Sequence, residues 1–101
     1  MSDPIGFAIV GTGAIADFHA NAIRGNVGAR LVAAYSRDAA RCEEFAKRHE
    51  CRAAATLDEI VRDADARAVC ITTPSGTHAE VAVPMLEAGK AVLCENPDRG
   101  R

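Results

Sequence analysis

The sequence predicts an α/β fold, a parallel sheet of about five strands with helices on both faces. Strand-like and helix-like patterns alternate along the whole chain, as in proteins built from strand–helix–strand units. The strand-like run at 31–35 is apolar throughout, as expected of a strand covered on both faces. A glycine turn at 11–13 follows the first strand-like run, at 5–10. Right-handed crossovers then predict the strand order 3-2-1-4-5, with a ligand where the order reverses.

The remaining elements follow from periodicity and capping signals. Strands are expected at 5–10, 31–35, 52–54, 68–72 and 91–94, and helices at 14–24, at 37–49, from 56 and from 77 to 88. Thr56 and Thr77 each precede a glutamate at capping-box spacing, which is typical of a helix start. Helical spacing predicts that an apolar stripe faces the sheet in the first two helices, made of Ala14, Ile15, Phe18, Ala22, Ile23, Ala40, Phe45 and Ala46.

The glycine turn is the strongest functional signal. Its residues are Gly11, Thr12, Gly13, Ala14 and Ile15, between a strand and the first turn of a helix. The first turn of a helix carries unpaired N–H groups and a partial positive charge, so a phosphate is its natural ligand. Gly11 allows a tight turn, and Gly13 allows a pyrophosphate to approach the main chain. The alternative is a tight turn without a ligand.

Composition excludes several classes of protein. The chain has 101 residues with a net charge of −2, which suits one soluble domain and argues against binding to nucleic acid or a membrane surface. No apolar run is long enough to cross a bilayer, so we expect a cytoplasmic protein. The four cysteines show no metal-ligand spacing. We expect Cys70 and Cys94, both in apolar runs, to be buried and reduced.

Several motifs together resemble the N-terminal half of the Gfo/Idh/MocA oxidoreductases. The resemblance covers about residues 5 to 97 and rests on the glycine turn, Tyr35-Ser36-Arg37, Thr72-Thr73-Pro74-Ser75 with His78, and Leu86-Glu87-Ala88-Gly89-Lys90 leading to Cys94-Glu95-Asn96-Pro97. It implies a Rossmann-type domain at 1–97 that binds NAD or NADP, followed here by a polar tail at 98–101. In full-length members a second domain follows, and hydride passes between the nicotinamide and a sugar, cyclitol or related alcohol.

The resemblance also implies which residues form the site. Thr73, Pro74 and Ser75 would line the adenosine and ribose region, with His78 just behind them. The loops at 11–13, 36–37, 73–75 and 95–97 open onto one edge of the sheet, which adds Glu95, Asn96 and Pro97 to the predicted dinucleotide site.

The resemblance has one departure in its chemistry. Family members usually have Glu-Lys-Pro where this chain has Glu95, Asn96 and Pro97. Asparagine has no titratable ammonium for proton transfer. The family's substrate domain is also absent from these residues, so we expect no catalysis from this chain alone.

The residues after the second strand favour NADP over NAD. NAD-binding folds of this type carry an acid there, whereas this chain has Ser36 and Arg37, with Arg41 one helical turn further on. A hydroxyl and guanidinium groups suit a 2′-phosphate. In the alternative interpretation the arginines form a solvated helix face, and Asp38 is close enough to reverse the preference.

Two other functions remain open on the sequence. The chain could be a stand-alone, non-catalytic module for dinucleotide sensing or protein interaction, or bind another nucleotide-like ligand such as S-adenosylmethionine. The GxGxxA spacing argues against the latter. We also expect self-association through an uncovered sheet edge, or through the face that a second domain would cover.

Overall fold

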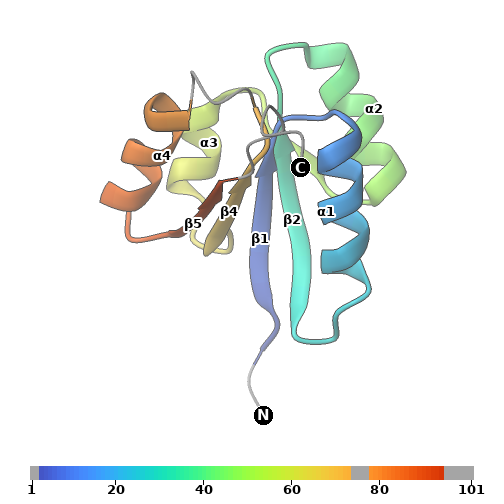
Figure 1. Ribbon diagram of the computed structural model, residues 1–101, viewed down its shortest axis with the longest axis horizontal. Helices are drawn as coiled ribbons and strands as arrows, with labels where there is room; N and C mark the ends of the chain where they lie inside the picture. Colours follow the sequence, from blue (N-terminus) through green and yellow to red (C-terminus); the bar gives the residue numbers. More distant parts are fainter. Residues whose placement is uncertain (1–2, 74–77, 95–101) are drawn as a thin grey trace, which may run out of the picture.

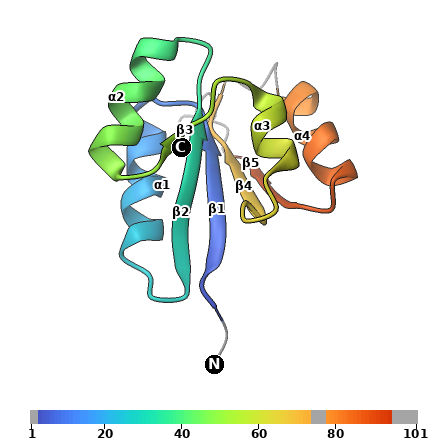
Figure 2. The ribbon, with the colours of Figure 1, turned by 180° about the vertical axis from the view of Figure 1, so that it is seen from behind.

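The computed structural model describes residues 3–73 and 78–94, and in this part of the chain the predicted sheet is confirmed. Five parallel strands lie in the order β3-β2-β1-β4-β5 (Figure 1; β3 is labelled in Figure 2). The strands are β1 (Ile5–Val10), β2 (Ala29–Tyr35), β3 (Arg52–Ala53), β4 (Ala68–Ile71) and β5 (Ala91–Cys94). The helices are α1 (Ala14–Arg24), α2 (Ala39–His49), α3 (Leu57–Arg62) and α4 (His78–Glu87).

The helices cover both faces of the sheet. Figures 1 and 2 show α1 and α2 on one face and α3 and α4 on the other. Each face has its own apolar cluster. Ile9 and Phe45 belong to the cluster under α1 and α2, whereas Val10, Ile60 and Met85 belong to the cluster under α3 and α4. Alternate residues of β1 therefore serve opposite faces, as strand geometry requires.

The apolar stripe predicted for α1 is partly wrong. Ala16, Ala20 and Ile23 are the buried residues of the helix, whereas Phe18 is 68% exposed. Ala14, Ile15 and Ala22 are also exposed. Small side chains against the sheet allow the helix to pack close to it, so Ala16 and Ala20 form the contact face together with Ile23, and Phe18 turns outward. In α2, Phe45 and Ala46 are buried as predicted, but Ala40 is exposed.

Capping residues set the starts of two helices. Asp38 caps α2 by accepting a hydrogen bond from the Arg41 N–H at 3.1 Å, so the helix begins at Ala39 and not at residue 37 as predicted. Thr56 caps α3 as predicted, since its Oγ1 accepts from the Glu59 N–H at 3.3 Å. The capping residue predicted at Thr77 lies outside the described residues.

None of the four cysteines forms a disulfide bond, and their surroundings differ. Cys42 and Cys70 are buried, whereas Cys94 is exposed on β5, which corrects the prediction that it is buried. Cys94 lies in an apolar run, but in the described part of the chain β5 has a neighbouring strand, β4, on one side only. Being in an apolar run is therefore not enough to bury it. In the described residues, no three metal-ligating side chains gather at one point, and no helix has the length and apolar character needed to span a bilayer.

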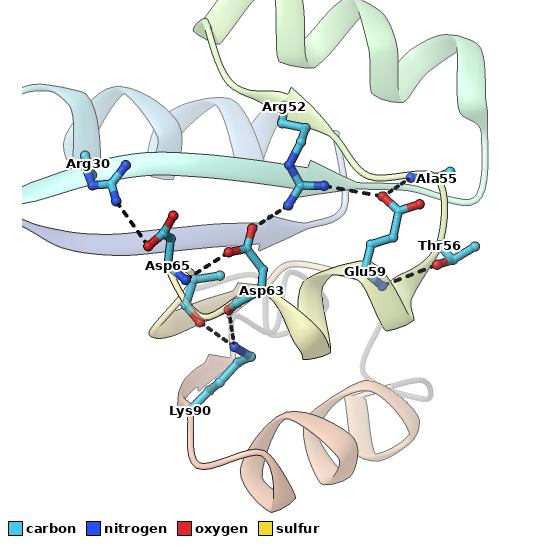
Figure 3. Close-up of polar contacts among 9 residues, drawn as sticks. Arg30, Arg52, Ala55, Thr56, Glu59, Asp63, Asp65 and Lys90 are labelled. Carbon is cyan, nitrogen blue, oxygen red and sulfur yellow. Dashed lines mark hydrogen bonds and ion pairs between the residues drawn. The ribbon is translucent and has the colours of Figure 1, made fainter.

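A polar network joins the segment after α3 to both halves of the sheet (Figure 3). Arg52 of β3 contacts the carboxylates of Glu59 and Asp63. Lys90, 9% exposed, donates from Nζ to the main-chain oxygens of Asp63 at 2.8 Å and Ala66 at 2.7 Å. Lys90 immediately precedes β5, so this network lies near the amino ends of β4 and β5 and leaves their carboxyl ends for other contacts.

Candidate functional site

A cavity of about 400 Å³ lies at the carboxyl ends of β1, β2 and β4. Strands β1 and β4 are neighbours in the sheet but not in the sequence, so this is the point where the strand order reverses. Ligands of open α/β sheets bind at such a point. The residues lining the cavity are Val10, Gly11, Tyr35, Ser36, Arg37, Leu57, Thr73, Glu80 and Val81.

Gly11 has a conformation that only glycine readily adopts. Its φ angle is +114°, and an added Cβ would lie 2.3 Å from Thr72 Oγ1. That hydroxyl is held by Val10, whose oxygen accepts from it at 3.1 Å. The Gly11 N–H donates to the oxygen of Tyr35 at 2.8 Å. The turn after β1 is therefore fixed against both neighbouring strands, and any side chain at Gly11 would strain it.

Gly13 differs, because the fold does not require a glycine there. It is the residue before α1, with an ordinary φ of −84° and no side-chain cap. An added Cβ would meet nothing within 4 Å. What the glycine preserves is open space before the first turn of α1, where the unpaired N–H groups of a helix lie. No side chain at Gly13 therefore obstructs the approach of a ligand to these N–H groups.

The other residues of the predicted turn lie beside the cavity. Thr12 is half-buried, and Ala14 and Ile15 are exposed in the first turn of α1. They are not among the residues that line the cavity itself. Their position is that of a main-chain binding segment, whose N–H groups rather than side chains would contact a phosphate.

The segment after β2 places only some of its polar groups in the cavity. Ser36 and Arg37 line the cavity, but Asp38 and Arg41 do not. The Asp38 carboxylate is used as the cap of α2, and its own N–H donates to Ser36 Oγ at 3.3 Å. Because Asp38 is engaged at the helix start, the cation Arg37 and the Ser36 hydroxyl form this side of the cavity.

The segment after β4 contributes Thr73 directly and His78 indirectly. Thr73 lines the cavity, and its main-chain oxygen lies 2.6 Å from His78 Nε2. His78 therefore contacts the main chain at Thr73 and does not line the cavity. The predicted site residues Pro74, Ser75, Glu95, Asn96 and Pro97 lie outside the described residues.

Five lining residues were not predicted as site residues from the sequence. Val10 and Tyr35 end β1 and β2, and the other three come from helices. Leu57 begins α3, and Glu80 and Val81 lie in the first turn of α4. The capping signals at Thr56 and Thr77 were the available clue. A cap that follows a strand places the first helical turn at the carboxyl edge of the sheet, next to any ligand bound there.

The fold and the cavity together define a Rossmann-type dinucleotide-binding domain. The family described as the Gfo/Idh/MocA oxidoreductase family, NAD-binding Rossmann fold, matches residues 5–98. The chain belongs to this family, and it is the family's NAD-binding domain.

The relatives show both the likeness and its extent. The chain is 42% identical to inositol 2-dehydrogenase of Rhizobium meliloti over 91 residues, which are 90% of this chain and 27% of that protein. It is 39% identical to the NADP⁺-dependent scyllo-inositol 2-dehydrogenase of Bacillus subtilis, over 92% of this chain and 29% of that protein. The chain therefore spans less than a third of the length of these relatives.

Solved structures agree on the fold and on the class of ligand. Biliverdin reductase of Synechocystis with biliverdin and NADP⁺ superposes with a TM-score of 0.86 at 31% identity, over 93% of this chain and 30% of that chain. The WlbA dehydrogenase of Chromobacterium violaceum with NADH superposes with a TM-score of 0.88 at 34% identity, over 96% of this chain and 28% of that chain. The neighbours thus include proteins with either nicotinamide dinucleotide.

Proposed function

We propose that this chain is the dinucleotide-binding part of an NADP-preferring oxidoreductase that acts on a cyclitol or a related sugar alcohol. The observation that carries the cofactor preference is the presence of Ser36 and Arg37 in the cavity at the end of β2. The proposed substrate class rests on the names of relatives, which include inositol 2-dehydrogenases.

Binding would begin at the glycine turn. The pyrophosphate would lie before α1, where Gly13 leaves space and the helix N-terminus supplies N–H donors and a partial positive charge. When bound, the dinucleotide supplies the hydride acceptor or donor. The chain itself holds it in place across the carboxyl ends of β1, β2 and β4.

The preference between the two dinucleotides would be set after β2. A carboxylate at this position accepts hydrogen bonds from the ribose hydroxyls of NAD and repels a 2′-phosphate. The Arg37 guanidinium instead attracts the phosphate, and the Ser36 hydroxyl donates to it. The Asp38 carboxylate accepts from the Arg41 N–H at the start of α2, and Asp38 does not line the cavity, so it would not contact the phosphate directly. Arg41 is a weaker contributor, because it does not line the cavity.

Calorimetric titration of the chain with NADPH and NADH tests the proposal. We expect saturable binding of both, with NADPH the tighter ligand. Arg37→Ala should weaken NADPH by about tenfold or more while changing NADH by less than about threefold. Arg62→Ala is the matched control, since Arg62 is exposed on α3 and pairs with Asp58 outside the cavity. Tighter binding of NADH, or equal effects of the two substitutions, would contradict the preference.

The same proposal includes a partner and a location. The edge strand β5 exposes Leu93 to 52%, on the sheet face opposite Val92, which packs with the α3 and α4 cluster. Unpaired, apolar strand edges favour association between chains, so we propose self-association through this side. We also propose a cytoplasmic location, because none of the described cysteines is joined in a disulfide bond and the ligand is a nicotinamide dinucleotide.

A further inference from the structure

We propose that Glu80 recognises the adenine base of the dinucleotide by accepting a hydrogen bond from its exocyclic amino group. The inference rests on the proposed function, since it assigns a base-reading residue within the same site. The proposed contact is made by the cavity wall that α3 and α4 form. The predicted phosphate-binding residues do not belong to this wall.

The lining of the cavity is divided between polar and apolar residues. Ser36 and Arg37 come from the end of β2 and suit the ribose and its phosphate. Leu57 and Val81 come from the first turns of α3 and α4 and suit a flat aromatic ring. Val81 is 8% exposed, so it presents a fixed surface. A nucleotide whose ribose lies at Ser36 would therefore place its base against α3 and α4.

Among the described residues that line this cavity, Glu80 is the one acid and Arg37 is the one base. Two other acids are paired with bases elsewhere. Asp17 contacts Arg48 and His49, and Asp63 contacts Arg52. Glu80 and Val81 are consecutive residues that both line the cavity, and Val81 is buried whereas Glu80 is exposed. The Glu80 carboxylate would therefore lie at the open edge of the apolar surface proposed for the base.

The chemistry of adenine matches this arrangement. A carboxylate at neutral pH only accepts hydrogen bonds. The edge of adenine carries one donor group, the exocyclic amine, and its ring nitrogens are acceptors. Hypoxanthine has an oxygen in place of the amine, so a carboxylate there would face another acceptor. Sites built to bond a ligand group discriminate strongly against analogues that lack it.

The test compares NADPH with the reduced dinucleotide phosphate that carries hypoxanthine in place of adenine. Titration calorimetry on the wild-type chain should give at least about tenfold tighter binding of NADPH. Glu80→Gln should bring the ratio to within about threefold, because the amide can rotate and donate to the hypoxanthine oxygen. Glu87→Gln is the matched control, on the same helix but outside the cavity, and should keep the wild-type ratio.

The outcomes separate the two levels of the proposal. Binding of NADPH without preference over the hypoxanthine analogue overturns the role of Glu80 and leaves the proposed function standing. A preference that persists in Glu80→Gln and in Glu80→Ala also overturns it, because another group would then read the base. If the wild-type chain binds no dinucleotide at all, the proposed function fails, and this inference fails with it.

Discussion

Asp17 and His49 lie 2.6 Å apart, Oδ1 to Nε2, and this contact joins the first turn of α1 to the last residue of α2. His49 is 5% exposed and packs against Phe45 with ring centroids 4.5 Å apart. Arg48 reaches the same Asp17 oxygen at 2.7 Å. No group among the described residues bonds to Nδ1 of His49, so Asp17 holds the only hydrogen bond of that ring in this part of the chain.

The first prediction concerns the loss of this contact. Asp17→Ala should lower the free energy of unfolding by about 1–3 kcal/mol, because it leaves a buried imidazole without a partner. Urea denaturation at pH 7 measures the change. Asp58→Ala, which removes an exposed ion pair with Arg62, should cost about 0.5 kcal/mol or less. If both substitutions lower the free energy of unfolding by the same amount, the Asp17–His49 contact contributes no more to stability than an exposed ion pair.

The second prediction concerns acid. Burial by itself raises the pKa of Asp17, but the hydrogen bonds and charges of Arg48 and His49 outweigh it and hold the pKa below its ordinary value. The stability that the ionised group contributes is therefore present above its unfolded pKa, near pH 4, and is lost as pH falls through the lower folded pKa. Denaturation midpoints measured from pH 6 to pH 2 should fall less steeply in Asp17→Asn. Parallel curves for both chains would contradict this.

The third prediction concerns Lys90. Its ammonium satisfies two main-chain oxygens, those of Asp63 and Ala66. Lys90→Met keeps the aliphatic stem but leaves both oxygens without this donor, so we expect a loss of about 2–3 kcal/mol in chemical denaturation. Lys47→Met, on the exposed face of α2, should change stability by less than about 0.5 kcal/mol. A Lys90→Met chain as stable as the control would exclude this structural role.

The fourth prediction separates the two glycines of the turn. Gly11→Ala should destabilise the fold by about 2 kcal/mol or more, because it strains a positive φ and forces a Cβ against Thr72. Gly13→Ala should leave stability within about 0.5 kcal/mol yet weaken dinucleotide binding by about tenfold or more. Thermal melts and calorimetry on both variants make the comparison. Unchanged affinity in Gly13→Ala would place the pyrophosphate elsewhere.

The fifth prediction concerns the edge of the sheet. Leu93→Lys should shift the chain toward the monomer, because a charge on an edge strand opposes pairing with a second copy. Light scattering across a concentration series reports the mass. Val27→Lys, at a site 98% exposed in the turn before β2, is the control and should leave the mass unchanged. A wild-type chain that stays monomeric at high concentration argues against the proposed self-association.

The sheet was predictable because its rules are local. The alternation of strand-like and helix-like segments predicted β1 and β5 with the bounds that the structure has. The right-handed crossover rule then predicted the observed strand order. Helical spacing placed Ile23 of α1 correctly but did not separate Ala16 from Phe18, since both are apolar. Close packing on the sheet selected the smaller residue, and this requirement comes from the tertiary structure.

The candidate site was predictable where it follows a strand directly. Gly11, Ser36, Arg37 and Thr73 come within a few residues of a strand end, and the structure places all four around one cavity. Leu57 and Glu80 reach the same cavity from the starts of α3 and α4, at positions fixed by the packing of those helices. The sequence separation between these groups carries no signal of their closeness.

The cavity draws its walls from the ends of β1 and β2, from the segment after β4 and from the starts of α3 and α4. A dinucleotide can bind there only when the chain is folded, because the cavity exists only when these parts are packed together. Binding of the dinucleotide therefore raises the free energy of unfolding, by about 2.7 kcal/mol when the free ligand is at a hundred times its dissociation constant. The lifetime of such a domain would therefore follow the size of the nucleotide pool around it, so that the redox supply of the cell also acts on the abundance of the protein.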